Sequence, residues 1–119
     1  GHHPTEIKAT LAALREKYPN KKIMVVFQPH LYSRTKLLLD EFAKSFRDAD
    51  EVLLLPIYAA REKSDPEINS KILAGQIPVA RYFPSFAQIV KYLRVHSGRH
   101  ALVLTLGAGD VYKVGEMVL

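Results

Sequence analysis

A chain of 119 residues with 48% hydrophobic and 24% charged residues is long enough for one domain with a real core, which excludes a disordered protein. The absence of cysteine excludes disulfides, thiolate metal sites and thiol catalysis, and agrees with a cytoplasmic location. The net charge of +5 favours anionic partners, but the basic residues are scattered and no apolar run approaches the roughly 20 residues of a membrane helix. We therefore expect a small anionic ligand, and neither a nucleic acid nor a membrane partner.

The first half of the chain predicts two helices and two strands. Pro4 suits the first turn of a helix that ends at 18–20, because the N–H that proline lacks would be unpaired there anyway. The following elements are a buried strand over 22–27, a helix over 35–46 and a second strand over 51–55. An α/β domain that starts with a helix lacks the strand that normally precedes that helix. We therefore expect the chain to be a piece of a longer protein.

The second half continues the alternation. Asp65 and Pro66 have the chemistry of a helix start, and Gly75 is predicted to lie just beyond the end of that helix. The remaining elements are a short strand over 79–82, a helix that Ser85 caps, a strand over 101–106 and a helical pattern over 111–118. Strands that alternate with helices predict a three-layer, Rossmann-like α/β sandwich with a mainly parallel sheet. With the strands numbered in chain order, we predict the sheet order 3-2-1-4.

The loop over 27–35 follows the first buried strand and is rich in polar side chains. Ligands of open α/β sheets bind outside the carboxyl ends of the strands, so this loop is predicted to be half of a binding site. His30 and Arg34 could grip a carboxylate or phosphate, with Arg34 supplying a two-pronged contact. The alternatives are a solvated loop in which Arg34 pairs with a neighbouring acid and a histidine that only caps the loop.

The Gly-Ala-Gly-Asp sequence over 107–110 separates the fourth strand from a helical pattern. Its backbone N–H groups could hold an anion, or its glycines could simply allow a tight turn. The sequence is neither a P-loop nor a complete dinucleotide fingerprint, since residue 112 is tyrosine.

Other polar clusters carry weaker signals. His2 and His3 are adjacent and would point in different directions, so we expect no metal site there, and an expression-tag remnant is an alternative. The charged residues over 61–65 are interpreted as a solvated loop, with a mobile lid as the alternative. No spacing predicts a catalytic triad or a carboxylate pair, so no catalytic residue is assigned and the chain is predicted to be a substrate-binding half.

Four motifs occur in order along the chain. They are Gly-His-His-Pro-Thr-Glu at 1–6, Phe-Gln-Pro-His and Tyr-Ser-Arg-Thr within 27–35, Pro-Ile-Tyr-Ala-Ala-Arg-Glu at 56–62, and Gly-Ala-Gly-Asp at 107–110. Together they resemble the carboxyl-terminal domain of the Mur ligase family, over essentially the whole chain.

The resemblance implies that residues 1–119 are one domain of a three-domain bacterial enzyme, whose amino-terminal and central domains are the partners of this one. It implies an ATP- and Mg²⁺-dependent ligase of peptidoglycan synthesis that adds L-alanine to UDP-N-acetylmuramate through an acyl phosphate and a tetrahedral intermediate. The nucleotide and the metal would be bound mainly by the central domain, with none expected in this chain, and the chain alone would be inactive.

Carried over by motif, the resemblance implies substrate-binding roles for four residues. Arg34 would anchor the alanine carboxylate or the nascent product, His2 would lie in the segment facing the cleft, and Ala108 and Gly109 would line the pocket through backbone groups. His30 is a fifth substrate-binding candidate, from its place in the loop after the first strand. Two departures are Leu31, where the family commonly has arginine, and the Asp-Asp-Tyr expected just before the first residue.

Two alternatives remain. The related ligase that recycles murein peptides shares the architecture, although the Gln-Pro-His and Tyr-Ala-Ala-Arg-Glu motifs favour the alanine-adding branch. A stand-alone regulatory α/β module would need an acidic cluster after the first strand, where this chain has Gln28 and His30.

Overall fold

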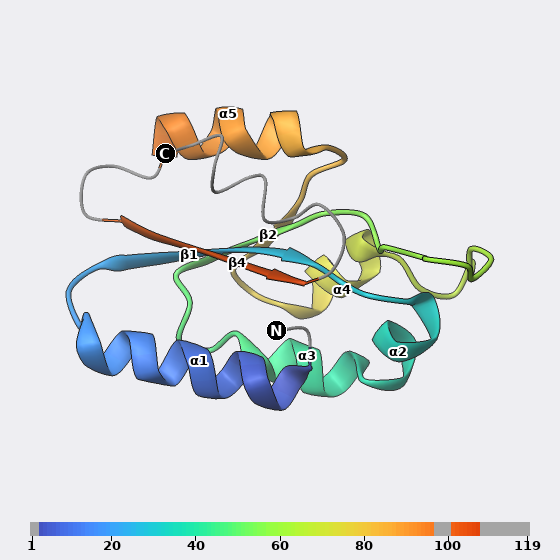
Figure 1. The fold of residues 1–119 in the computed structure, drawn as a ribbon, viewed down its shortest axis with the longest axis horizontal. Helices are drawn as coiled ribbons and strands as arrows, with labels where there is room; N and C mark the ends of the chain where they lie inside the picture. Colours follow the sequence, from blue (N-terminus) through green and yellow to red (C-terminus); the bar gives the residue numbers. More distant parts are fainter. Residues whose placement is uncertain (1–2, 97–100, 108–119) are drawn as a thin grey trace.

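The computed structural model describes residues 3–96 and 101–107 (Figure 1). Its elements in chain order are α1 (Pro4–Lys17), β1 (Lys22–Gln28), α2 (Tyr32–Leu37), α3 (Leu39–Ser45), β2 (Glu51–Leu54), α4 (Ser70–Gln76), β3 (Ala80–Tyr82), α5 (Phe86–His96) and β4 (Ala101–Gly107). The helical pattern predicted over 111–118 lies outside the described residues. Among the residues that are described, no helix combines the length and the apolarity that a bilayer-crossing segment needs.

The four strands form one parallel sheet in the order β3-β2-β1-β4, which confirms the predicted order. β1 lies in the middle, where Met24 pairs with Glu51 of β2 on one side and with Val103 of β4 on the other. Residues 23–27 are completely buried. A central parallel strand is covered on both faces, and this explains why the strand is apolar without interruption.

Helices cover both faces of the sheet, as predicted. Because side chains alternate along a strand, Val25 and Phe27 point into one core with α1, α3 and α4, and Met24 and Val26 point into a second core with α5. Figure 1 shows α5 above the sheet and α1 and α3 below it. The Phe27 ring lies 5.5 and 5.4 Å from the rings of two phenylalanines near α3, Phe42 and Phe46, measured between centroids.

Three of the predicted helix boundaries were wrong. The helix predicted over 35–46 is two helices, because Leu38 leaves helical geometry at φ −104° and ψ 16°. The helix predicted to start after Asp65 begins at Ser70, with the Asn69 side chain accepting a hydrogen bond from the N–H of Ile72. Gly75 lies inside this helix rather than beyond its end. The Asp65 carboxylate is used elsewhere, in contacts with the N–H of Glu67 and with Lys36, and so does not cap the helix.

Charged side chains hold the amino-terminal edge of the sheet, which is the side where the parallel strands begin. Asp50, in the turn before β2, accepts hydrogen bonds from Arg15 of α1 at 2.8 Å and from the N–H of Ile23 at 2.7 Å. Arg15 also donates to the carbonyl oxygens of Lys21 and Asp48, both at 2.9 Å. Partial burial alone would raise the pKa of Asp50, but the hydrogen bonds from Arg15 and Ile23 outweigh it, and the pKa lies below its ordinary value.

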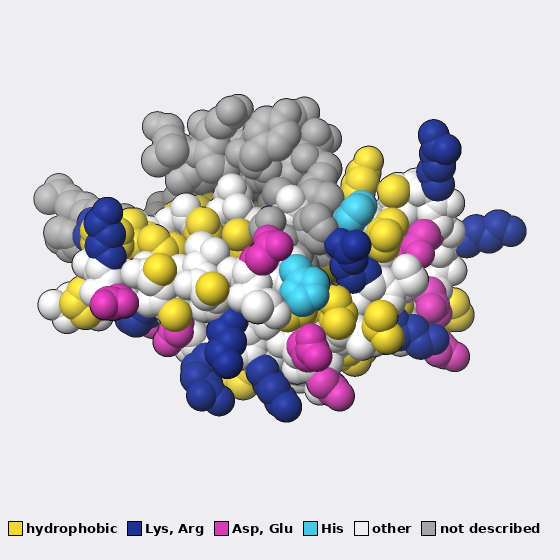
Figure 2. Space-filling model, turned by 60° about the horizontal axis from the view of Figure 1, so that its bottom comes forward, with side chains coloured by type: hydrophobic (Ala, Val, Ile, Leu, Met, Phe, Trp, Pro, Cys, Tyr) yellow, Lys and Arg dark blue, Asp and Glu magenta, His cyan; other side chains and the backbone are white. Residues whose placement is uncertain are grey.

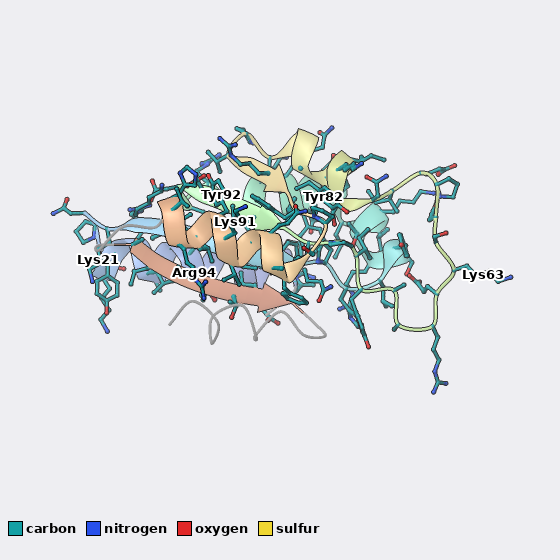
Figure 3. The ribbon with its side chains drawn as sticks, turned by 90° about the horizontal axis from the view of Figure 1, so that it is seen from above. Lys21, Lys63, Tyr82, Lys91, Tyr92 and Arg94 are labelled. Carbon is teal, nitrogen blue, oxygen red and sulfur yellow. The ribbon has the colours of Figure 1, made fainter. Side chains whose placement is uncertain are left out.

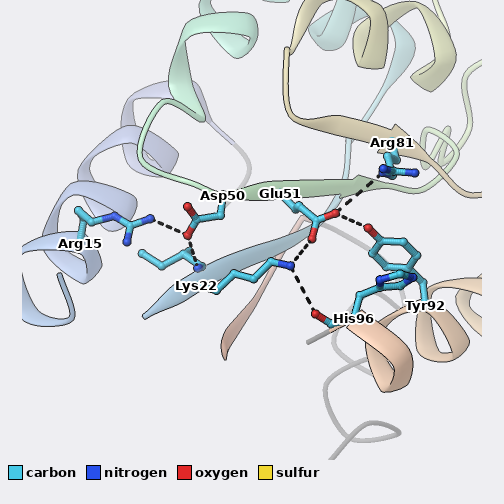
Figure 4. Close-up of polar contacts among 8 residues, drawn as sticks. Arg15, Lys22, Asp50, Glu51, Arg81, Tyr92 and His96 are labelled. Atoms are coloured by element: carbon cyan, nitrogen blue, oxygen red, sulfur yellow. Dashed lines mark hydrogen bonds and ion pairs between the residues drawn. The ribbon is translucent and has the colours of Figure 1, made fainter. Parts of the chain in front are cut away.

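A second acid, Glu51, holds the same edge to α5 (Figure 4). Its carboxylate pairs with Lys22 at 2.8 Å and accepts a hydrogen bond from the hydroxyl of Tyr92, while Arg81 lies 3.9 Å away. Burial works to raise the pKa of Glu51, but Lys22 and Tyr92 together outweigh it, and the pKa lies below its ordinary value. Lys22 also donates to the carbonyl of His96 at 3.4 Å. β1, β2, β3 and α5 therefore meet at one compact charge network.

Candidate functional site

A hollow of about 600 Å³ lies near the carboxyl end of β1. The residues that line it come from the start of α1, the loop after β1 and the region of α2, and they are His3, Glu6, Leu31, Ser33, Arg34, Leu37 and Leu38. Leu37 is 83% exposed, the highest fraction among the large hydrophobic side chains that the structure describes as exposed. The hollow therefore combines the guanidinium of Arg34 and the carboxylate of Glu6 with an uncovered apolar wall.

Arg34 is half-buried in the wall of this hollow. Within residues 3–96 and 101–107, no acceptor forms a hydrogen bond or an ion pair with its guanidinium. This disagrees with the alternative in which Arg34 pairs with a neighbouring acid of the described chain. A guanidinium offers a rigid set of donors that matches a carboxylate or a phosphate, so Arg34 is placed to bind such a group.

The start of α1 lies beside Arg34, although the two are far apart in sequence. His3 lines the hollow, and its Nδ1 accepts a hydrogen bond from the N–H of Thr5 at 3.2 Å, which caps α1. His2 falls outside the described residues, so its predicted role stays a prediction. The fold thus brings the segment of the first motif next to the arginine of the second.

His30 is not among the residues that line the hollow. Its ring stacks on that of Tyr58, with centroids 5.8 Å apart and planes inclined by 22°, and the two residues form an isolated parallel bridge. The structure therefore does not join His30 and Arg34 into the two-residue grip that the sequence suggested. His30 connects the loop after β1 to the segment after β2.

Leu31 occupies a strained position at the start of α2. Its φ is 67°, in the left-handed region that a residue other than glycine rarely adopts. Its N–H donates to the carbonyl of Tyr58 at 2.8 Å, and its carbonyl accepts from the N–H and the hydroxyl of Thr35. These contacts hold the turn that directs α2, and Thr35 is completely buried.

Sequence reasoning missed the role of Glu62, which it assigned to a solvated loop. Its carboxylate accepts hydrogen bonds from the hydroxyl of Ser33 at 2.5 Å and from the N–H of Ser33 at 3.2 Å. Asp65 of the same connection lies 3.6 Å from Lys36, so α2 is contacted at two points. The signal that could have found Glu62 was its place at the end of a quoted motif. Lys63, at the outer turn of the connection, does point to solvent (Figure 3).

Gly107 ends β4 opposite Gln28 of β1. Its φ is +122°, and a Cβ at this position would overlap the carbonyl oxygen of Gln28. The glycine is thus required by both its backbone conformation and its close approach, as the tight-turn interpretation held. The buried Oε1 of Gln28 has no hydrogen-bond partner among the described residues. Ala108 and Gly109, the other predicted pocket residues, lie outside the part of the chain that the structure describes.

Features expected of a nucleotide–magnesium site are missing from the sequence and from the part of the chain that the structure describes. The sequence has no P-loop with its phosphate-binding lysine. The described residues contain no group of three His, Cys, Asp or Glu side chains that could hold a metal ion. On the face shown in Figure 2, Lys and Arg side chains are interspersed with acidic and hydrophobic ones and form no single basic patch. The chemistry that this site supports is the binding of one small anionic group.

Curated relatives extend over the whole chain. It is 55% identical to the UDP-N-acetylmuramate–L-alanine ligase of Acetivibrio thermocellus and 52% identical to that of Alkaliphilus metalliredigens, in each case over 99% of this chain. The chain spans about a quarter of the length of these relatives, 26% of each.

Solved structures share the fold. The UDP-N-acetylmuramate–alanine ligase of Thermotoga maritima superimposes with a TM-score of 0.76 at 24% identity, covering 99% of this chain and 24% of that one. A murein peptide ligase of Psychrobacter arcticus gives a TM-score of 0.72 at 20% identity, covering 99% and 25%. The family model of the Mur ligase glutamate ligase domain matches residues 1–109, and this chain therefore belongs to the Mur ligase family, as its carboxyl-terminal domain.

Proposed function

We propose that this chain is the carboxyl-terminal domain of a three-domain bacterial, cytoplasmic enzyme that joins L-alanine to UDP-N-acetylmuramate with hydrolysis of ATP. The observation that carries this proposal is the identity of about half of the residues, over 99% of the chain, with ligases of that name. Because the chain spans only 26% of those relatives, the remaining substrate sites belong to the parts that the relatives have beyond it. We propose that ATP and Mg²⁺ are bound mainly there, since this chain has no P-loop and its described residues hold no group of three possible metal ligands.

Arg34 is the proposed anchor for the carboxylate of L-alanine. It is the cation that lines the hollow, and its guanidinium has no acceptor among the described residues. A two-pronged contact would hold the carboxylate and leave the amine directed away from it, toward the activated muramoyl carboxyl. His2, Ala108 and Gly109 are proposed to complete this wall, with His30 behind it.

The exposed apolar surface of the hollow is proposed to face the preceding domain. Leu31, Leu37 and Leu38 form this surface beside Arg34. Closure onto the central domain would cover Leu37 and exclude water from the arginine, and an ionic contact is stronger when it is shielded from water. The whole enzyme would proceed through an acyl phosphate and a tetrahedral intermediate, while the part of this chain is to bind and orient the amino acid.

The experiment is steady-state kinetics of the full-length enzyme that contains this chain, with Arg34→Ala and Arg34→Lys. Losing a buried carboxylate-binding charge costs about 2–5 kcal/mol, so we expect Arg34→Ala to raise the KM for L-alanine by about 30-fold or more. Arg34→Lys keeps the charge but loses the fork, and should give an intermediate KM. The KM values for ATP and the UDP-sugar should stay unchanged. An unchanged alanine KM in Arg34→Ala would refute the assignment.

The competing function is that of the ligase that attaches a preformed murein peptide, with which this chain shares a fold. Phosphate release with L-alanine and, separately, with a murein tripeptide distinguishes the two. We expect turnover with L-alanine only, and turnover with the tripeptide alone would replace the proposed function by its competitor. The 119-residue chain by itself should show no turnover with either substrate.

A further inference from the structure

We propose that Glu62 is a positioning residue for Arg34, and that the segment after β2 sets the geometry of the alanine-binding arginine. This inference rests on the proposed function and adds a residue from a different part of the chain. Glu62 does not line the hollow and would not touch the substrate.

The first support is the contact that Glu62 makes with α2. Both carboxylate oxygens face Ser33, one accepting from its hydroxyl at 2.5 Å and the other from its N–H at 3.2 Å. Ser33 directly precedes Arg34. A two-point contact to the backbone and side chain of Ser33 fixes the rotation of the first turn of α2, and so the direction in which the next side chain leaves the helix.

The second support is that the segment after β1 pairs with the segment after β2 at residues that precede Glu62 in the chain. The N–H of Leu55 donates to the carbonyl of Phe27, and the N–H of Tyr58 donates to the carbonyl of Pro29. The N–H of Leu31 donates to the carbonyl of Tyr58. These bonds, 3.0, 2.8 and 2.8 Å long, continue the pairing of β1 with β2 beyond the ends of the strands. The ring of His30 stacked on Tyr58 adds a side-chain contact at the same place.

The third support is the local chemistry of the contact. α2 has only six residues, and its first residues lack any side-chain cap from Leu31, which precedes the helix. A carboxylate placed at this end satisfies N–H groups that would otherwise lack a partner and interacts favourably with the helix dipole. The hydrogen bonds from Ser33 lower the pKa of Glu62, as expected when donors stabilise the ionised carboxylate.

Together these contacts explain why a leucine is held at φ 67° directly before α2. Without partners such a turn would relax toward ordinary backbone angles, because the left-handed conformation is unfavourable for leucine. Tyr58 holds the turn on one side through the N–H of Leu31, and Glu62 holds it on the other through Ser33. Arg34 is then carried by a turn that is fixed at both sides.

The test measures the KM for L-alanine in the full-length enzyme with Glu62→Ala, Glu62→Gln and Ser33→Ala. A misdirected guanidinium loses part of its two-pronged contact with the carboxylate, so we expect Glu62→Ala to raise this KM about tenfold, with no change in the KM for ATP. Glu62→Gln keeps an acceptor for the N–H and should give a smaller rise. Ser33→Ala, which keeps the backbone donor, should also give a smaller rise.

The matched control is Glu67→Gln, which removes the same charge from the same connection. Glu67 pairs with the side chain of Lys36 at an exposed position and does not contact the start of α2. Exposed ion pairs contribute little, so we expect its alanine KM to equal that of the unmodified enzyme.

A double mutant separates positioning from a general structural role. If Glu62 acts through Arg34, then adding Glu62→Ala to Arg34→Ala raises the alanine KM no further. A rise of the same factor in both backgrounds would overturn the inference, as would a change below about threefold in the single variant. If Glu62→Ala does not fold, Glu62→Gln and Ser33→Ala decide by the same comparison. If Arg34→Ala itself leaves the KM unchanged, the proposed role of Arg34 fails and this inference fails with it, whereas an effect of Arg34→Ala without an effect of Glu62→Ala removes only this inference.

Discussion

The edge of the sheet where the strands begin and the edge where they end are built in opposite ways. At the amino-terminal edge, Asp50 and Glu51 are held by arginine, lysine, tyrosine and backbone donors. At the carboxyl edge, Arg34 faces a hollow and has no acceptor within the described residues, next to an exposed Leu37. Charges that stabilise the fold are satisfied inside the chain, and the charge proposed to bind a substrate is left for a ligand. Figure 3 shows the two ends of the molecule, marked by Lys21 and Lys63.

The largest expected effect on stability concerns Gly107, at the carboxyl edge. Gly107→Ala combines a strained φ with a clash against Gln28, so we expect the free energy of unfolding to fall by about 3 kcal/mol. Urea denaturation of the 119-residue chain measures it. Gly75→Ala is the control, because no atom lies within 4 Å of the place that its Cβ would take in α4 and alanine favours a helix. Equal stabilities for both variants would show that the carboxyl edge is not built around a close approach.

A smaller effect is expected from Asp50→Asn at the amino-terminal edge. Asparagine can still accept from the N–H of Ile23 but loses the ion pair with Arg15, and the Asp50 side chain is 44% exposed. We expect a loss of about 1 kcal/mol, because exposure to water weakens the pair. Thermal unfolding of the same chain measures this change. A change in alanine KM of the full-length Asp50→Asn enzyme would break the division of the two edges into structural and functional ones.

The smallest expected effect is a dependence on acid. The folded-state pKa values of Asp50 and Glu51 lie below their ordinary values of 3.8 and 4.5, so their contribution is complete above these values. It is lost as the pH falls through the lower, folded-state pKa values. We expect the melting temperature to fall below about pH 4.5, and to fall less in Glu51→Gln than in the unmodified chain. Identical acid profiles would exclude Glu51 as a source of the pH dependence.

The predicted strands were confirmed where the apolar pattern was long and uninterrupted. Residues 23–27 and 101–106 are apolar runs that form the buried central strand and the half-buried edge strand β4, and the alternation with helices led to the observed sheet order. The failures were local. Asp65 and Pro66 have the chemistry of a helix start, but Asp65 pairs with Lys36. The helix begins instead at Ser70, with Asn69 as its cap. A capping side chain acts only if tertiary contacts leave it free.

The sequence by itself determined the fold class, the family and the strand order, because apolar periodicity and ordered motifs are properties of the chain alone, and it predicted a binding role for Arg34. Only the tertiary structure decided which polar residues meet. It placed His30 against Tyr58 rather than beside Arg34, and it brought Glu62 to the start of α2. The reason is that parallel strands align segments that are distant in the chain, and no spacing along the sequence records which side chains then lie within about 3 Å of one another.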